Sequence, residues 1–302
     1  MRNGSSLRIT SYAGKIQFRA AQGAQENCAG RETEESWIKE TEMFSTPFTL
    51  SVAGKGGTGK TSTTALLLRA VLEKGLFEEI LVVDADPASN IGDILGVSVT
   101  KTIGDVLDRR KISLETVSAA ESKLLREELV DAIGQADGFD FLVMGRTTGK
   151  GCYCPVNSLL RKLLDEVIRL YGLVLIDFDA GLEHFSRQTD TKSDALMVIT
   201  DPSKMGFETA RRIKDLAREI GYSYRLEWLV GSRFSPRMEQ QFFACAEATG
   251  LEPLHTIPYD EKLMTLNLEG KTIFDLDANS ASYISVGILL DKIHNLVSGK
   301  VA

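Results

Sequence analysis

The sequence predicts an α/β protein in a single domain, with a mostly parallel sheet that helices cover on both faces. Two observations predict this fold. From residue 48 onward, short apolar runs of strand length alternate with longer segments of helical periodicity, and such an alternation builds right-handed βαβ crossovers. The strand-length runs are also almost continuously apolar, which is typical of strands buried on both faces of a parallel sheet.

The predicted elements follow one another in a regular order. The first strand, Phe48–Ala53, ends in a glycine-rich loop, and the first helix, Thr61–Lys74, carries apolar residues at helical spacing. Residues 102–137 are helical or mixed and stay unassigned. The further predicted strands are Ile80–Val83, Phe139–Met144, Leu173–Ile176, Ala195–Thr200, Leu226–Val230 and Leu254–Ile257, and the further predicted helices are Asn157–Leu170, Gly206–Ile220, Pro236–Thr249 and Ser280–Val297.

The composition is that of an ordinary globular protein. The 302 residues are 43% hydrophobic and 25% charged, with a formal net charge of −7. The acidic balance argues against general binding of nucleic acid, which needs a basic face. No apolar run approaches the roughly 20 residues that span a bilayer. We therefore expect neither nucleic acid nor membrane as a partner. Four cysteines in a chain this long indicate reduced thiols and a cytoplasmic location.

Residues 1–46 differ in composition from the rest of the chain. They are rich in Ser, Gly, Gln and Glu, and no continuous apolar stretch follows Arg2 and Arg8, which argues against a secretory signal. We interpret residues 1–46 as an N-terminal extension that is flexible or weakly helical, with translation from Met43 as the alternative. Residues 47–302 then form the folded domain, and Cys28 in the extension receives no role.

A phosphate-binding loop follows the first strand. Gly54–Thr61 fits the pattern G-x-x-x-x-G-K-[ST] between a strand and a helix. Glycines allow successive backbone N–H groups to face one point, and the helix N-terminus adds partial positive charge there. Lys60 is expected to reach the β- and γ-phosphates, and the Thr61 hydroxyl to ligate Mg²⁺. The predicted fold is therefore that of a P-loop NTPase. The loop residues expected to bind nucleotide are Gly54, Lys55, Gly56, Gly57, Thr58, Gly59, Lys60, Thr61 and Ser62.

Acidic residues end two of the predicted strands. Asp84 and Asp86 follow the second strand, and Asp177 follows Leu173–Ile176. Ligands bind at the carboxyl ends of parallel strands, and Asp177 fits a Walker B aspartate that holds Mg²⁺. A single Asp after a strand is equally typical of a turn or a helix cap. Together with the phosphate loop, these residues favour a site for nucleotide and metal.

Cys152 and Cys154 are separated by one residue in the segment Gly151–Pro155. Their spacing is too short for a relaxed disulfide. One chain offers two thiolates here, whereas a closed soft-metal site takes four, which two copies of the pair at a two-fold axis can supply. Such a site suits Zn²⁺, Ni²⁺ or an iron–sulfur cluster, and ligand softness does not choose among them. The alternative is a pair of incidental cysteines.

The second lysine in the loop, Lys55, gives the form K-G-G-x-G-K-[ST]. This form resembles the deviant Walker A motif of the P-loop ATPases that include MinD, ParA, the nitrogenase iron protein and the arsenite-pump ATPases. The resemblance implies that Lys55 reaches across a nucleotide-sandwiched homodimer to the partner's phosphates. It also implies that Asp86 orients the attacking water and that Asp84 supports the Mg²⁺ shell, so Lys55, Lys60 and Asp86 are the expected catalytic residues.

Further segments narrow the resemblance. Asp84–Pro87 reads D-x-D-P, Cys152–Asn157 reads C-Y-C-P-x-N, and Ala180–His184 reads A-G-L-E-H. With Ile257–Tyr259, these segments resemble the CooC family, the nickel-handling ATPases of carbon monoxide dehydrogenase maturation, from residue 48 to the C-terminus. The resemblance implies a dimeric metallochaperone that hydrolyses ATP with Mg²⁺. Its cargo is Ni²⁺, or Zn²⁺ on the same thiolates of Cys152 and Cys154, and its client is carbon monoxide dehydrogenase.

The base site departs from this resemblance. Relatives read adenine with an Asn-Lys pair after a late strand, where this chain has Ser232 and Arg233. A serine hydroxyl does not present the two-sided amide of asparagine. Ser232, Pro258 and Tyr259 are expected to line the base, and selectivity for adenine stays open.

Three alternative functions are compatible with parts of the sequence. A positioning ATPase of the ParA/MinD type needs a basic patch or a basic amphipathic end, and the C-terminal helix carries few cations. An iron–sulfur reductase like the nitrogenase iron protein has cluster cysteines far apart in sequence, unlike Cys152 and Cys154. A nickel factor that serves acetyl-CoA synthase shares every feature above, so the sequence does not separate the two clients.

Overall fold

The computed structural model describes residues 48–86, 91–108, 119–145, 155–178 and 193–298. The predicted extension, residues 1–46, lies outside the described residues, so its boundary with the folded domain stays a prediction. The described residues form a single α/β domain, as the sequence predicts. Among them, none of the helices combines the length and the apolar character that crossing a membrane requires.

One sheet of eight strands runs through the described part of the chain, in the order β3-β4-β2-β5-β1-β6-β7-β8. All neighbouring strands are parallel except β3 and β4, which pair antiparallel at one edge. The prediction of a mostly parallel sheet is confirmed. The strands are β1 Phe48–Gly54, β2 Ile80–Asp84, β3 Ile133–Gln135, β4 Asp140–Val143, β5 Leu173–Asp177, β6 Ala195–Thr200, β7 Leu226–Ser232 and β8 Glu252–Ile257.

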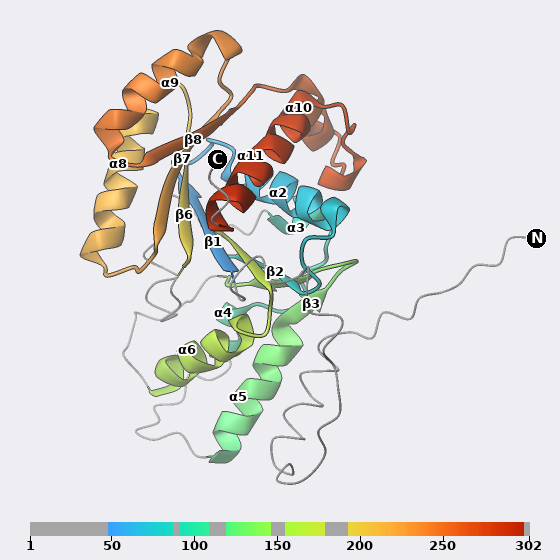
Figure 1. Ribbon diagram of the computed structural model, residues 1–302. Helices are drawn as coiled ribbons and strands as arrows, with labels where there is room; N and C mark the ends of the chain where they lie inside the picture. The colour runs from blue at the N-terminus through green and yellow to red at the C-terminus, as the bar shows by residue number, and fades with distance from the viewer. Residues whose placement is uncertain (1–47, 87–90, 109–118, 146–154, 179–192, 299–302) are drawn as a thin grey trace, which may run out of the picture. The chain divides into compact units, whose positions relative to one another are not determined.

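Helices cover both faces of the sheet (Figure 1). Alternate residues of each strand enter opposite cores: Ile80 and Val82 of β2 pack on one face, and Leu81 and Val83 pack on the other. The first face carries α2 Lys60–Lys74, α3 Ile91–Leu95, α10 Glu261–Leu268 and α11 Ala281–Val297. The second face carries α4 Ile103–Asp108, α5 Ala119–Ala132, α6 Pro155–Ile168, α8 Lys204–Glu219 and α9 Glu239–Ala246.

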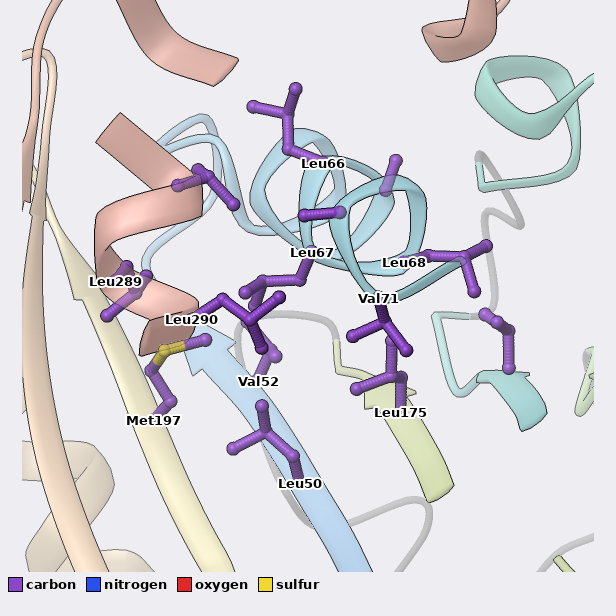
Figure 2. Close-up of a cluster of buried hydrophobic side chains, with 14 of the residues drawn as sticks. Leu50, Val52, Leu66, Leu67, Leu68, Val71, Leu175, Met197, Leu289 and Leu290 are labelled. Carbon is purple, nitrogen blue, oxygen red and sulfur yellow. The ribbon is translucent and has the colours of Figure 1, made fainter. Parts of the chain in front are cut away.

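The helix α2, which follows the glycine-rich loop, packs into the core on the first face of the sheet. Figure 2 shows Leu66, Leu67 and Val71 of α2 beside leucines of α11, above the side chains of β1, β5 and β6. Leu67 is 1% exposed and Val52 of β1 is fully buried. Burial of this kind stabilises each large aliphatic side chain by about 1.5–3 kcal/mol, so the first turn of α2 has a fixed position above the end of β1.

The structure differs from the prediction in four short elements, one of which is the helix α3, which was not predicted. Pro236–Thr249 is not one helix but a 3-10 turn, the helix α9 and a second 3-10 turn, Glu247–Thr249. The helix α10 was not predicted, because Leu266 is its one buried position. The side chain of Asp260 caps the helix by accepting the N–H of Lys262. The edge strand β3 has three residues, which is too short for any hydrophobic period.

A buried arginine connects α2 to the segment before α11. Arg69 is 7% exposed, and its guanidinium donates to the carbonyl oxygens of Ile273 at 3.0 Å and Leu276 at 2.6 Å. The same group ion-pairs with Glu73 at 2.7 Å and stacks 4.3 Å from the ring centroid of Tyr283. The Ile273 carbonyl also accepts the N–H of Leu276 at 3.3 Å, so the buried Leu276 carbonyl is the group that depends most on the Arg69 side chain.

We expect Arg69→Met to lower the free energy of unfolding by about 2–4 kcal/mol, because it removes the hydrogen bond to the buried Leu276 carbonyl and one of two hydrogen bonds to the Ile273 carbonyl. Urea denaturation measures the change. Lys74→Met is the matched control, since Lys74 forms an exposed ion pair with Asp291, and such pairs contribute below about 1 kcal/mol. Equal losses in the two variants would show that the Arg69 hydrogen bonds do not stabilise the fold.

Candidate functional site

The glycine-rich loop crosses from the carboxyl end of β1 to the N-terminus of α2. Gly57 and Gly59 have positive φ values of 79° and 92°, which an L side chain adopts only with strain. A Cβ atom on Gly54 would lie 2.4 Å from the carbonyl oxygen of Ile199 on β6. Glycine is therefore required at Gly54 by close packing and at the other two positions by backbone conformation.

Hydrogen bonds within the loop give it a closed form. The Thr58 hydroxyl and N–H both donate to the carbonyl oxygen of Lys55, at 2.8 and 3.2 Å. The Lys60 ammonium lies 3.4 Å from that same oxygen, and Lys60 is only 7% exposed. Thr61 and Ser62 are half-buried in the first turn of α2. A nearly buried cation thus stands inside a loop of backbone N–H groups at a helix N-terminus, an arrangement that favours phosphate.

Two buried carboxylates lie beside the loop. Asp84 ends β2 and Asp177 ends β5, and the two residues are direct partners in the register of these strands. Each is 1% exposed. The Asp84 carboxylate accepts the N–H of Asp86 at 3.0 Å and the N–H of Ile91 at 3.4 Å. The sheet register therefore brings together the two acidic strand ends that the sequence predicted separately.

Electrostatics at this pair favour a bound cation. Burial raises the pKa of Asp177 to about 7; a hydrogen bond from the Thr61 hydroxyl opposes the rise, and the charge of Asp84 adds to it. Lys60 supplies positive charge nearby. A buried negative charge is costly unless a positive charge or hydrogen-bond donors compensate it. Carboxylate and hydroxyl oxygens are ligands that suit Mg²⁺. The chemistry of Thr61, Asp84 and Asp177 is therefore compatible with a magnesium site, and their role as its ligands stays a prediction.

Lys55 and Asp86 are the other two residues predicted to take part in catalysis. Asp86 is half-buried and close enough to Asp177 for its charge to raise the pKa of that carboxyl. The Lys55 ammonium lies 3.5 Å from Asp201, which follows β6. Burial raises the pKa of Asp201, but hydrogen bonds from Ser203 and the charge of Lys55 outweigh burial and lower it overall. The sequence did not predict this ion pair, because no local pattern connects the two residues.

A pocket opens beside the first turn of α2. Gly59 and Ser62 line it together with Ser232, Pro258 and Tyr259, the three residues that the sequence predicted around a base. Ser232 is only 7% exposed. The contribution of α10 to this pocket was not predicted, because α10 itself was not predicted as a helix. The additional lining residues include Arg233, Met264 and Asn267.

The predicted soft-metal ligands, Cys152 and Cys154, lie outside the described residues, and so does the segment Ala180–His184. Within the described ranges, Cys245 is an exposed free thiol, and His, Cys, Asp and Glu side chains form no group of three suited to a metal ion. The soft-metal site therefore stays a prediction from sequence.

Comparisons with known proteins identify similar nucleotide-binding proteins. Residues 50–273 match the CobQ/CobB/MinD/ParA nucleotide binding domain, CbiA. An uncharacterized ATP-binding protein of Methanocaldococcus jannaschii is 39% identical over 250 residues, covering 82% of this chain and 98% of that protein. The carbon monoxide dehydrogenase accessory protein CooC of Rhodospirillum rubrum is 27% identical over 259 residues, covering 81% of this chain and 97% of that protein.

Solved structures show the same fold. The septum site-determining protein MinD of Pyrococcus horikoshii, complexed with Mg-ADP, superposes with a TM-score of 0.62 at 22% identity. The superposition covers 84% of this chain and 99% of MinD. At this level of identity the likeness concerns the fold alone.

Proposed function

The chain belongs to the CobQ/CobB/MinD/ParA nucleotide-binding family, and from this premise we propose that it is an ATP-switched homodimeric metallochaperone. It binds a soft divalent metal, nickel, through Cys152 and Cys154 and delivers it during maturation of carbon monoxide dehydrogenase. The observation that carries the ATPase part is the buried Asp84–Asp177 pair beside Lys60. The cargo and the client are supported by the two cysteines and by similarity to the CooC protein.

The hydrolytic step uses side chains of the phosphate loop and of the two acidic strand ends. Lys60 and the loop N–H groups hold the β- and γ-phosphates. Thr61, Asp84 and Asp177 hold Mg²⁺, which when bound neutralises charge on the phosphate oxygens. Asp86 orients the attacking water. Lys55 leaves Asp201 and reaches the phosphates of the partner subunit, where a second cation stabilises the charge of the transition state.

Nucleotide and metal are coupled through the dimer. Each chain contributes two thiolates, so a four-thiolate site forms only when two chains meet. ATP closes the dimer and completes the metal site, and hydrolysis opens it and releases the metal to the client. By linkage, the metal must tighten ATP-driven dimerisation by the same factor by which ATP tightens metal binding.

Anaerobic titration with Ni²⁺ and with Zn²⁺, in the presence and absence of ATP, tests this function. We expect one metal ion per two chains and tighter binding with ATP. Cys152→Ser is expected to abolish both metal binding and metal-driven dimerisation measured by size-exclusion chromatography. Cys245→Ser is the matched control, because Cys245 is an exposed thiol of the described residues, and it should change neither. An unchanged metal stoichiometry in Cys152→Ser would refute the shared site.

Other outcomes distinguish the alternative functions. A visible absorption spectrum of a stable cluster after anaerobic iron–sulfur reconstitution would favour a reductase. Absence of metal binding together with ATP-dependent sedimentation on anionic vesicles or DNA would favour a positioning ATPase. Metal transfer to acetyl-CoA synthase but not to carbon monoxide dehydrogenase would identify the alternative client.

A further inference from the structure

The ion pair between Lys55 and Asp201 connects the glycine-rich loop to the strand beside it. The register of β1 and β6 pairs Gly54 with Ile199, so Lys55 and Asp201 follow two strand ends that lie side by side. The two ends are in close contact, because a Cβ on Gly54 would lie 2.4 Å from the carbonyl oxygen of Ile199. The sheet therefore fixes the backbone on both sides of the ion pair.

The start of α8 holds the Asp201 carboxylate in place. Its Oδ1 accepts the N–H of Ser203 at 3.2 Å and also the Ser203 hydroxyl. The oxygen of that hydroxyl accepts the N–H of Gly206 at 3.0 Å, so Ser203 caps the helix. A Cβ on Gly206 would lie 2.4 Å from Oδ1, so glycine leaves room for the carboxylate against the first turn. The other oxygen, Oδ2, accepts from the Lys55 ammonium at 3.5 Å.

The two partners of this ion pair differ in how firmly they are held. The side chain of Asp201 is 22% exposed, and two hydrogen bonds from Ser203 fix it. The side chain of Lys55 is 40% exposed and has the flexible four-carbon stem of a lysine. A fixed anion thus binds a flexible cation of the same subunit.

This arrangement has a consequence for the dimer, and the inference rests on the proposed function, in which Lys55 reaches the partner's phosphates. Carboxylate and phosphate are both anions, and they repel each other when a single ammonium is shared between them. Lys55 therefore gives up Asp201 when it binds the partner's phosphates. A contact that exists in the open state and is lost in the closed state shifts the equilibrium toward the open state.

We propose that Asp201 is a positioning residue that retains Lys55 on its own subunit and thereby raises the protein concentration at which ATP drives dimerisation. An ion pair of partly exposed side chains shifts an equilibrium by up to about fivefold. Closure of the dimer breaks one such pair in each subunit, so two pairs of about threefold each shift dimerisation by about tenfold. Each subunit keeps its lysine until nucleotide and partner are both present.

Sedimentation velocity of the full chain with Mg²⁺ and the non-hydrolysable imido analogue of ATP tests the proposal. Asp201→Asn keeps an oxygen for the Ser203 hydrogen bonds and removes the charge that holds Lys55. We expect its dimer dissociation constant to fall by about four- to twentyfold.

Asp194→Asn is the matched control. Asp194 precedes β6, whereas Asp201 follows it, so the two carboxylates lie at opposite ends of the strand. Asp194 is similarly exposed, at 20%, and forms an ion pair with Arg225 at 2.7 Å. Because this pair lies away from the carboxyl ends of the strands, Asp194→Asn should leave the dimer dissociation constant within about twofold of the wild-type value.

Urea denaturation of the nucleotide-free chain measures the ion pair independently of dimerisation. Lys55→Ala and Asp201→Asn remove the same contact, so the double variant should be no less stable than the less stable of the two single variants. Additive losses of stability would overturn the proposal, because Asp201 would then act through the start of α8 and not through Lys55.

An unchanged or weaker dimer in Asp201→Asn would also overturn the proposal, since the carboxylate would then have no effect on closure or would support Lys55 in the closed dimer. Asp201→Ser removes the same charge and replaces Asp201→Asn in this test if the asparagine variant does not fold. Absence of nucleotide-dependent dimers in the wild-type chain would refute the proposed ATP-switched dimer and the inference with it, which is a different result from a dimer of unchanged affinity.

Discussion

Lys55→Ala is expected to lower the rate of ATP hydrolysis by about 10³-fold while changing the affinity for ATP only a few-fold. The reason is the place of Lys55 at the outer side of the loop, where its ammonium lies 3.5 Å from Asp201 and its side chain is 40% exposed. A cation in this position can reach a partner subunit, and stabilisation of transition-state charge affects the rate more than ground-state binding. Steady-state hydrolysis and equilibrium binding of a non-hydrolysable analogue separate the two effects.

Lys60→Ala is the comparison that distinguishes a loss of nucleotide binding from a loss of hydrolysis rate. Lys60 is buried inside the loop, so its loss should weaken nucleotide binding itself. Lys204→Ala is the surface control, since that side chain is 90% exposed on α8. If Lys55→Ala weakened binding as much as Lys60→Ala, Lys55 would act on the phosphates of its own subunit.

Mixing two inactive variants tests directly whether Lys55 acts across the dimer. In a heterodimer of Lys55→Ala and Asp86→Asn, one of the two sites has Asp86 from its own chain and Lys55 from its partner. We expect the mixture to recover about a quarter of wild-type activity, because about half of the dimers are mixed and each has one intact site. Absence of recovery, with dimers present by size-exclusion chromatography, would contradict action in trans.

Asp177→Asn is expected to have opposite effects on stability and on catalysis. Burial and the neighbouring Asp84 raise the pKa of Asp177 from 3.8 to about 7. A carboxyl whose pKa is raised on folding binds its proton more tightly in the folded state. The nucleotide-free protein therefore loses stability through this group as the pH rises from its unfolded-state pKa to its folded-state pKa, by at most about 4 kcal/mol.

The neutral amide removes this cost. Thermal denaturation in EDTA should show a higher Tm for Asp177→Asn than for the wild type near about pH 8, and a smaller difference near about pH 5. Hydrolysis should fall by about 10²-fold or more because a ligand of the Mg²⁺ site is lost. Asp137→Asn, at an exposed position, is the control for both measurements. A lower Tm in Asp177→Asn near about pH 8 would show that the carboxylate stabilises the nucleotide-free fold.

The parts of the fold that were predicted correctly are those encoded over short stretches of chain. The strands β1, β2, β5 and β6 read as apolar runs, and Gly54–Thr61 reads as a loop between a strand and a helix. Each of these patterns depends on residues within one element. By contrast, α10 has a single buried leucine, so its sequence shows almost no helical period of apolar residues. The Asp260 cap stabilises the start of this helix. A helix stabilised mainly by its cap and its neighbours leaves a weak signal in sequence.

The sequence by itself determined the identity of the chemistry-bearing residues: the glycines and Lys60 of the loop, the acidic strand ends and the polar residue Ser232 at the end of β7. Only the tertiary structure decided which of them act together. The register of β2 and β5 makes Asp84 and Asp177 neighbours, residues 93 positions apart in the sequence. The same packing pairs Lys55 with Asp201 and occupies Asp260 with backbone donors. Charge, burial and hydrogen bonding between distant segments depend on distance in space, and distance in space is set by the folded sheet.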